Sequence, residues 1–214
     1  MNSYYETHKR RYGHTLDIIK EYDLLKNGDS VLSLGPCGFF KDILFGEFKV
    51  SIEETECDLR YDIPLYKKYD LILCLEVIEH IKDKDSNDIN SLSTFTGSGI
   101  KSLIRESSRL INSNGAFLMS TPNIHCYKNI FNWINRDDLY TYALHPRELS
   151  EKYIISELKK YYKEIMSMYR LSWGCHGTPQ HFIEIVEKFM IENNFSTDNR
   201  IEDNLFLISK EVVK

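Results

Sequence analysis

Two glutamates and a histidine, Glu76, Glu79 and His80, follow an apolar run in the first half of the chain. If Glu76 begins a helical turn, the other two side chains lie three and four residues further on and point to the same face. Carboxylate and imidazole groups together are ligands for a divalent cation, and the segment contains no cysteine that would indicate a thiolate zinc site. The alternative is an ordinary helical N-terminus, where acidic residues are favoured by the helix dipole.

Two other histidines could extend this chemistry. His125 follows the sequence Ser-Thr-Pro-Asn at residues 120–123, and His145 lies further along the chain. A single histidine is more often structural than catalytic, but a histidine that joins a Glu-Glu-His cluster has a stronger claim to function.

Two turns carry residues suited to a nucleotide-like ligand. Gly35 and Gly38 follow an apolar run and would let the backbone approach a ligand closely, although such a turn is also an ordinary connection between strand and helix. Glu53 and Glu54 follow a second strand-like run, where a carboxylate could accept hydrogen bonds from both hydroxyls of a ribose. A solvated acidic turn is the alternative for this pair.

The elements that must position these residues alternate between strand-like and helix-like patterns. This alternation predicts an α/β fold: a Rossmann-like, doubly wound, mostly parallel sheet of about six to seven strands with helices on both faces, whose ligand site lies at the carboxyl ends of the strands. We expect one domain over residues 1–214, with an N-terminal helical segment (1–28) and a Rossmann-like core (29–214). The predicted strands are 31–34, 48–52, 70–75, 116–119, 164–171 and 204–209, and the predicted helices are 15–25, 39–45, 98–111, 149–162 and 179–192.

Composition narrows the class of protein further. A net charge of −5 disfavours a protein that holds nucleic acid mainly through phosphate contacts. The five cysteines form no Cys-x-x-Cys pair and predict reduced thiols, and no apolar run approaches the roughly 20 residues of a membrane span. We therefore expect a cytoplasmic protein without a membrane span.

The ordered set of segments resembles class I S-adenosylmethionine-dependent methyltransferases, especially the branch with a Glu-x-x-Glu-His segment. The resemblance covers residues 31–150, and its order and spacing are far more specific than any single member. The matching segments are residues 31–35, 57–59, 63–64, 69–73, 76–80, 106–115 and 120–123.

The resemblance implies S-adenosylmethionine as cofactor and assigns residues to it. The chain departs from the family at Ser33, where an acidic residue is common, and in the short gap between Glu53 and Asp58, which would normally contain a helix and a strand. By the resemblance, Gly35, Pro36 and Cys37 line the methionine end, Glu53 holds the ribose, Asp58 and Leu59 contact the adenine, and Cys74 and Leu75 border it.

Within this branch the chain also looks like the metal-dependent small-RNA 2′-O-methyltransferases, which bind magnesium or manganese. That likeness implies Glu76, Glu79, His80 and His145 as ligands of Mg²⁺ or Mn²⁺. It leaves His125, or His80 if it is not a ligand, as a base, so that His80, His125 and His145 are the catalytic candidates. The same segment occurs in ubiquinone-pathway and glycan-modifying O-methyltransferases, so RNA is not implied.

We therefore predict an O-methyltransferase that acts on a hydroxyl of a sugar, a glycan precursor or a similar polar metabolite. One alternative is an RNA 2′-O-methyltransferase, which would require a basic groove that the acidic composition disfavours. Another is a non-catalytic cofactor-binding scaffold or regulatory subunit, which the altered glycine loop leaves open. Residues 172–179 follow a predicted strand, where an acceptor could be recognised, with Trp173 able either to stack on a sugar ring or to pack in the core. Residues 82–97 could close over the site, but their pattern fixes no role. The oligomeric state stays open.

Overall fold

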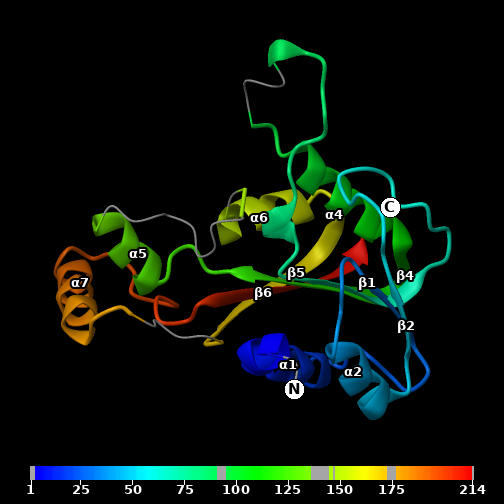
Figure 1. Cartoon of the computed structure of the whole chain (residues 1–214), viewed down its shortest axis with the longest axis horizontal. Helices are drawn as coiled ribbons and strands as arrows, with labels where there is room; N and C mark the ends of the chain where they lie inside the picture. Colours follow the sequence, from blue (N-terminus) through cyan, green and yellow to red (C-terminus); the bar gives the residue numbers. More distant parts are fainter. Residues whose placement is uncertain (1–2, 91–94, 136–144, 147, 173–176, 214) are drawn as a thin grey trace.

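A six-stranded sheet forms the centre of the computed structural model, which describes residues 3–90, 95–135, 145–146, 148–172 and 177–213. The strand order is β2-β1-β3-β4-β6-β5 (Figure 1). The first four strands in this order run parallel, and β6 is antiparallel to both β4 and β5. The predicted Rossmann-like, mostly parallel sheet is confirmed. The strands are β1 (Ser30–Ser33), β2 (Ser51–Glu54), β3 (Tyr69–Leu75), β4 (Ile111–Pro122), β5 (Tyr162–Arg170) and β6 (Asn204–Val212).

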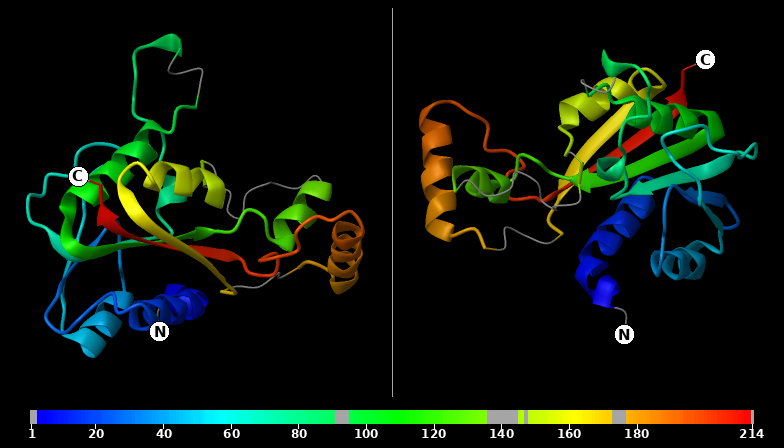
Figure 2. Two further views of the ribbon diagram at one scale, coloured as in Figure 1. Left: turned by 180° about the vertical axis from the view of Figure 1, so that it is seen from behind. Right: turned by 45° about the horizontal axis from the view of Figure 1, so that its top comes forward.

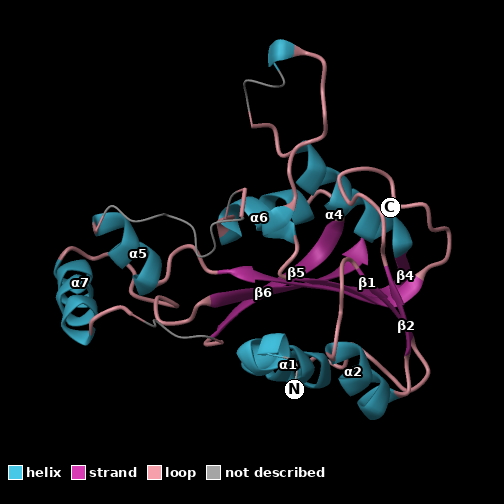
Figure 3. Ribbon diagram, in the orientation of Figure 1, coloured by secondary structure: helices cyan, strands magenta, loops and turns pink. Residues whose placement is uncertain are grey.

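Helices cover both faces of the sheet (Figure 3). One face is covered by α1 (Ser3–Glu21) and α2 (Phe40–Phe48), and the other by α4 (Ser98–Leu110) and α6 (Glu151–Leu158). Two further helices, α5 (Tyr127–Ile134) and α7 (Gln180–Glu192), lie beyond one end of the sheet (Figure 2).

The residues of the central strands alternate between two buried clusters. In β4, Phe117 and Met119 pack on the α4 and α6 side, whereas Ala116 and Leu118 pack on the α1 and α2 side. Each fully buried large side chain stabilises the fold by roughly 1.5–3 kcal/mol, so a strand that buries both faces must be apolar throughout. This burial explains why the apolar run at residues 70–75 predicted a central strand.

Several boundaries differ from the sequence predictions. Helix α1 begins at Ser3 instead of residue 15, and Ile18 and Ile19 in it are fully buried in the core. Phe48 ends α2 instead of starting a strand, because Lys49 adopts a left-handed backbone conformation with φ of 53° and breaks the extended run. Helix α5 was not predicted at all.

The segment that follows His80 projects away from the sheet (Figure 1). Its base is closed by Asp83, whose carboxylate accepts hydrogen bonds from the backbone N–H groups of Thr96 and Ser98. Of residues 172–179, Trp173 lies outside the described residues, so the predicted stacking role is not addressed. None of the helices that the structure describes is long and apolar enough to cross a membrane.

Candidate active site

The turns that leave β1 and β3 lie side by side, as the parallel pairing of these strands requires. Gly35, two residues after the end of β1, has φ of +107°, a backbone conformation that residues with a side chain rarely adopt. A Cβ built at Gly35 would lie 3.0 Å from Cγ2 of Val77, which belongs to the segment that leaves β3. The glycine loop and the Glu76–His80 segment therefore lie together at one edge of the sheet, the edge formed by the carboxyl ends of the parallel strands.

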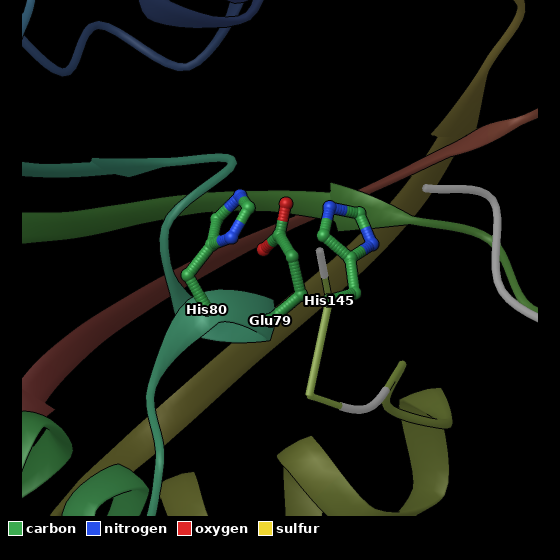
Figure 4. Close-up of side chains that lie close together, drawn as sticks. All are labelled: Glu79, His80 and His145. Carbon is green, nitrogen blue, oxygen red and sulfur yellow. The ribbon is translucent and has the colours of Figure 1, made fainter. Parts of the chain in front are cut away.

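A cluster of one carboxylate and two imidazoles lies at this edge (Figure 4). Glu79 and His80 come from a 3-10 turn, Ile78–His80, and His145 comes from a distant segment. One ligand atom from each side chain lies within 4.8 Å of the other two. Glu79 is fully buried, and its Oε2 accepts a hydrogen bond from Thr121 at 3.2 Å. Its Oε1 is buried without a hydrogen-bond partner among the described residues.

Electrostatics favour the neutral forms of Glu79 and His80 in the absence of a cation. Burial and the neighbouring Glu76 carboxylate raise the pKa of Glu79 well above its usual value. Burial and the nearby His145 ring lower the pKa of His80. A bound divalent cation would reverse the preference for a neutral carboxyl group, because it stabilises the carboxylate directly.

Glu76 lies beside this cluster but outside the group of three. The condition that Glu76 begins a helical turn is not met, because Glu76 precedes the 3-10 turn and has a left-handed φ of 54°. Its N–H still bonds to the Ser120 carbonyl, which extends the pairing of β3 and β4 by one residue. The Glu76 carboxylate accepts hydrogen bonds from Ser120 Oγ at 2.7 Å and Asn204 Nδ2 at 3.1 Å. The role of Glu76 as a metal ligand therefore stays a prediction.

Arg11, from helix α1, approaches Glu76 from the opposite face of the sheet. The guanidinium Nη1 lies 3.8 Å from Glu76 Oε2, and the arginine side chain is almost completely buried. His8, one turn earlier, has a pKa lowered to about 4 by burial and by Arg11. The first helix thus brings a buried cation to the carboxylates at this edge of the sheet.

His145 is held by a neighbouring carboxylate. Its Nδ1 lies 3.2 Å from Glu148 Oε1, and both side chains are buried. Glu148 Oε2 accepts a second, longer hydrogen bond, 3.4 Å, from the amide of Asn129 at the start of α5.

His125 is separate from the cluster of three. Its backbone N–H donates to Asn123 Oδ1 at 3.0 Å, and its carbonyl accepts from Arg200. The imidazole reaches the surface of the protein. The part of the ring that is covered, together with the positive charge of Arg200, lowers its pKa. His125 is thus an accessible imidazole in the turn that leaves β4, and its role as a base stays a prediction.

The predicted residues of the cofactor loop differ in their accessibility. Pro36 is exposed, whereas Cys37 is buried and burial raises the pKa of its thiol to about 11. The Cys37 N–H donates to Glu54 Oε1 at 3.1 Å, which places Glu54 next to the loop. Glu53 points to the other face of the sheet, where its Oε2 accepts a 2.6 Å hydrogen bond from the Tyr69 hydroxyl.

The residues assigned to the adenine lie on a loop between β2 and β3. Asp58 is exposed and binds the Arg60 guanidinium, and Leu59 is buried. Leu75 is half-buried at the end of β3. Cys74 is fully buried in the core between β3 and the helices on the α4 side, and its role beside the adenine stays a prediction.

A buried carboxylate holds this loop against α4. Glu106 accepts hydrogen bonds from the Ile63 N–H at 3.0 Å and from Arg109 Nη2 at 2.6 Å. The Arg109 guanidinium also donates to the carbonyls of Ile63 and Leu65. This network fixes a loop at the place where the sequence lacks the usual helix and strand.

Sequence reasoning did not place Arg11, Glu106 or Glu148 beside the candidate site. Glu106 and Arg109 matched a family segment, and their i, i+3 spacing allows the ion pair that the structure contains. The positions of Arg11 and Glu148 depend on packing between distant segments, so the sequence carried no local signal for them.

Comparison of the structure with solved structures identifies the fold. A SAM-dependent methyltransferase from Archaeoglobus fulgidus superimposes with a TM-score of 0.58 at 12% identity, over 98% of this chain and 100% of that chain. The N-methyltransferase NodS from Bradyrhizobium japonicum, in complex with S-adenosylhomocysteine, gives 0.54 at 12% identity over 96% and 87% of the two chains. The methyltransferase domain of bacterial CtHen1-C gives 0.53 at 14% identity over 95% and 98%.

The sequence itself adds no closer assignment, because no protein-family model and no curated protein matches it. The chain has the fold of class I S-adenosylmethionine-dependent methyltransferases. At these identities, the structural likeness defines the fold and leaves the acceptor undefined.

Proposed function

We propose that this chain is an S-adenosylmethionine-dependent O-methyltransferase, assisted by a divalent cation, that acts on a hydroxyl of a sugar, a glycan precursor or a similar polar metabolite. The observation that carries the proposal is the cluster of Glu79, His80 and His145 at the same sheet edge as the glycine loop. In a parallel α/β sheet this edge is where ligands bind.

The residues of the glycine loop fit the cofactor. Gly35 presents bare backbone with a positive φ, and a Cβ there would occupy the space beside Val77. We assign the ribose hydroxyls to Glu54 in preference to Glu53, because Glu54 lies at the loop whereas the Glu53 carboxylate is bound by Tyr69. When bound, S-adenosylmethionine would supply a methyl group on a sulfonium: an acceptor oxygen bonds to the methyl carbon in line as the C–S bond breaks, and S-adenosylhomocysteine is the leaving group.

The cluster also fits a divalent cation. A buried carboxylate oxygen without a partner, next to two imidazoles, is costly in an empty site and is satisfied by a metal. Two imidazoles and one carboxylate suit Mn²⁺ and related ions, and Mg²⁺ would prefer more oxygen ligands. When bound, such an ion lowers the pKa of a coordinated hydroxyl and fixes its position.

The need for such activation favours an oxygen acceptor. A neutral amine is nucleophilic without help, whereas a sugar hydroxyl stays protonated at pH 7 and is a poor nucleophile. His125 is exposed in the adjoining turn, with a lowered pKa that keeps the imidazole neutral and able to accept the hydroxyl proton. Alignment of donor and acceptor in one crevice supplies the rest of the rate enhancement.

The net charge of the chain bears on the kind of acceptor, and its free thiols bear on the cellular compartment. A net charge of −5 favours a small polar acceptor over a long polyanion. Cys37, Cys57, Cys74 and Cys126 are free thiols, which fits a reducing compartment such as the cytoplasm.

The proposal is tested by titration calorimetry followed by a methylation assay. We expect S-adenosylhomocysteine and Mn²⁺ each to bind the wild-type chain. With radiolabelled S-adenosylmethionine and a panel of polyhydroxylated acceptors, we expect oxygen methylation that excess EDTA abolishes and Mn²⁺ restores. The variant Glu79→Ala should lose turnover and retain cofactor affinity.

Failure to bind S-adenosylhomocysteine would overturn the methyltransferase assignment and favour a scaffold role. Full activity in EDTA would overturn the metal, and methylation of amines alone would overturn the oxygen acceptor. Glu164→Gln, an exposed carboxylate on β5, serves as the matched control and should behave as wild type.

A further inference from the structure

His145 and Glu148 form a buried, hydrogen-bonded pair. Only 6% of the His145 side chain and 4% of the Glu148 side chain are exposed. Glu148 Oε1 lies 3.2 Å from His145 Nδ1. Because a carboxylate only accepts, the proton of this hydrogen bond belongs to Nδ1 of the imidazole.

This hydrogen bond decides which nitrogen of His145 is available. With Nδ1 occupied by Glu148, Nε2 is the ring nitrogen that can present a lone pair to another group. Figure 4 shows one nitrogen of the His145 ring directed toward the Glu79 carboxylate and the other directed away from it. Glu148 therefore selects the tautomer that offers a lone pair to the cluster.

Glu148 is in turn held from its other side. The Asn129 amide donates to Glu148 Oε2 at 3.4 Å and to the Asn123 carbonyl at 3.3 Å. Asn123 directly follows β4, so this chain of contacts ties the His145 segment to the carboxyl end of a central strand. The orientation of His145 is thus fixed relative to the sheet, and Glu79 lies in the turn that follows strand β3 of the same sheet.

We propose that Glu148 is a positioning residue that fixes the ring orientation and tautomer of His145, so that Nε2 is the metal-binding atom. The inference rests on the proposed function, because it assumes that the cluster of Glu79, His80 and His145 binds a divalent cation. Carboxylate partners of ligating histidines typically change metal affinity 10- to 100-fold when they are removed.

The test compares three variants of the full chain. Glu148→Ala removes the acceptor, and we expect the dissociation constant for Mn²⁺, measured by calorimetry, to rise about 10- to 100-fold. Glu148→Gln keeps a carbonyl oxygen that accepts from Nδ1, so the loss should be only a few-fold. Glu157→Ala is the matched control: Glu157, on α6, is also buried and forms an ion pair with Lys160, and its replacement should leave Mn²⁺ affinity unchanged.

A second measurement reads the tautomer without any metal. Nitrogen-15 NMR of the imidazole at pH 8 should show Nδ1 protonated and Nε2 unprotonated for His145 in the wild type and in Glu148→Gln. In Glu148→Ala, the proton should shift toward Nε2, because nothing then stabilises it on Nδ1. If Glu148→Ala does not fold, Glu148→Asp, whose shorter side chain moves the carboxylate away from Nδ1, takes its place.

The outcomes separate the two ideas. Wild-type Mn²⁺ affinity and an unchanged His145 tautomer in Glu148→Ala would overturn the positioning role and leave the proposed metal site intact. Failure of the wild type to bind Mn²⁺ would overturn the metal, and with it this inference, even if Glu148 set the tautomer. Weakened Mn²⁺ binding together with a shifted proton, rescued by Glu148→Gln, would support the proposal.

Discussion

Replacement of Glu106 by glutamine should loosen the loop that carries the proposed adenine contacts. Glu106 is only 2% exposed and accepts hydrogen bonds from the Ile63 N–H and from Arg109. Hydrogen bonds to a charged group contribute about 1.5–3 kcal/mol each when buried, but Arg109 and Arg105 are 40% and 44% exposed, so solvent screens much of this. Because glutamine keeps one acceptor oxygen, we expect a loss of about 1–2 kcal/mol.

The pH dependence of this loss has a definite sign. Burial would raise the pKa of Glu106, but the hydrogen bonds from Arg109 and Ile63 outweigh it and the pKa lies below the ordinary value of 4.5. The unfolded chain therefore binds a proton before the folded protein does, and the stabilisation is complete above pH 4.5 and lost as the pH falls through the lowered pKa. The difference between wild type and Glu106→Gln should shrink in the same interval.

Urea unfolding followed by far-ultraviolet circular dichroism at pH 7 and pH 3.5 provides the measurement. In thermal unfolding, the same loss corresponds to about 2–8 °C for a chain of this size. A difference below about 0.5 kcal/mol at pH 7, the range of ordinary surface substitutions, would refute the argument. A difference that stays constant down to pH 3.5 would refute the electrostatic part of it. Glu164→Gln removes an exposed charge and should change neither value.

Three further predictions concern the site. Glu79→Gln should abolish Mn²⁺ binding in calorimetry without lowering the free energy of unfolding in EDTA, because burial and Glu76 already raise the pKa of Glu79 and favour its uncharged form when no cation is bound; retained Mn²⁺ binding would contradict this. Gly35→Ala should cost about 1–2 kcal/mol and weaken S-adenosylhomocysteine binding at least tenfold, because φ is +107° and the new Cβ would press on Val77; unchanged unfolding and affinity would argue against it. Glu54→Gln should weaken that binding about tenfold, whereas Glu53→Gln should mainly lower stability through the Tyr69 hydroxyl; the reverse result would restore Glu53 as the ribose ligand.

The central strands could be predicted from the sequence because a strand that is buried on both faces is apolar at nearly every position. The runs at residues 70–75 and 116–119 are apolar at nearly every position, and both are central strands in the structure. The edge strand β2 is half-exposed and begins at Ser51, whereas the sequence predicted a start at residue 48. Phe48 is apolar because it is the last residue of α2 and not because it belongs to a strand. Local pattern cannot separate these two causes.

The site was predictable only in part for a similar reason. Glu79 and His80 are adjacent in a turn, and their association with His145 followed a family resemblance. The turn itself was misjudged at Glu76, whose left-handed backbone is fixed by pairing with Ser120, a contact between strands that no local spacing encodes. The approach of Arg11 likewise depends on how α1 docks beneath the sheet.

The position of β6 between β4 and β5 sets the order in which this protein can assemble. Among the described strands, β5 borders β6 alone, so residues 162–170 have no place in the sheet until residues 204–212 have been synthesised and inserted. Asn204, which binds the Glu76 carboxylate, arrives in the same step. On the ribosome, the edge of β4 that pairs with β6 would stay open to chaperones and proteases until residues 204–212 have emerged, and the contact between Asn204 and Glu76 could form only then.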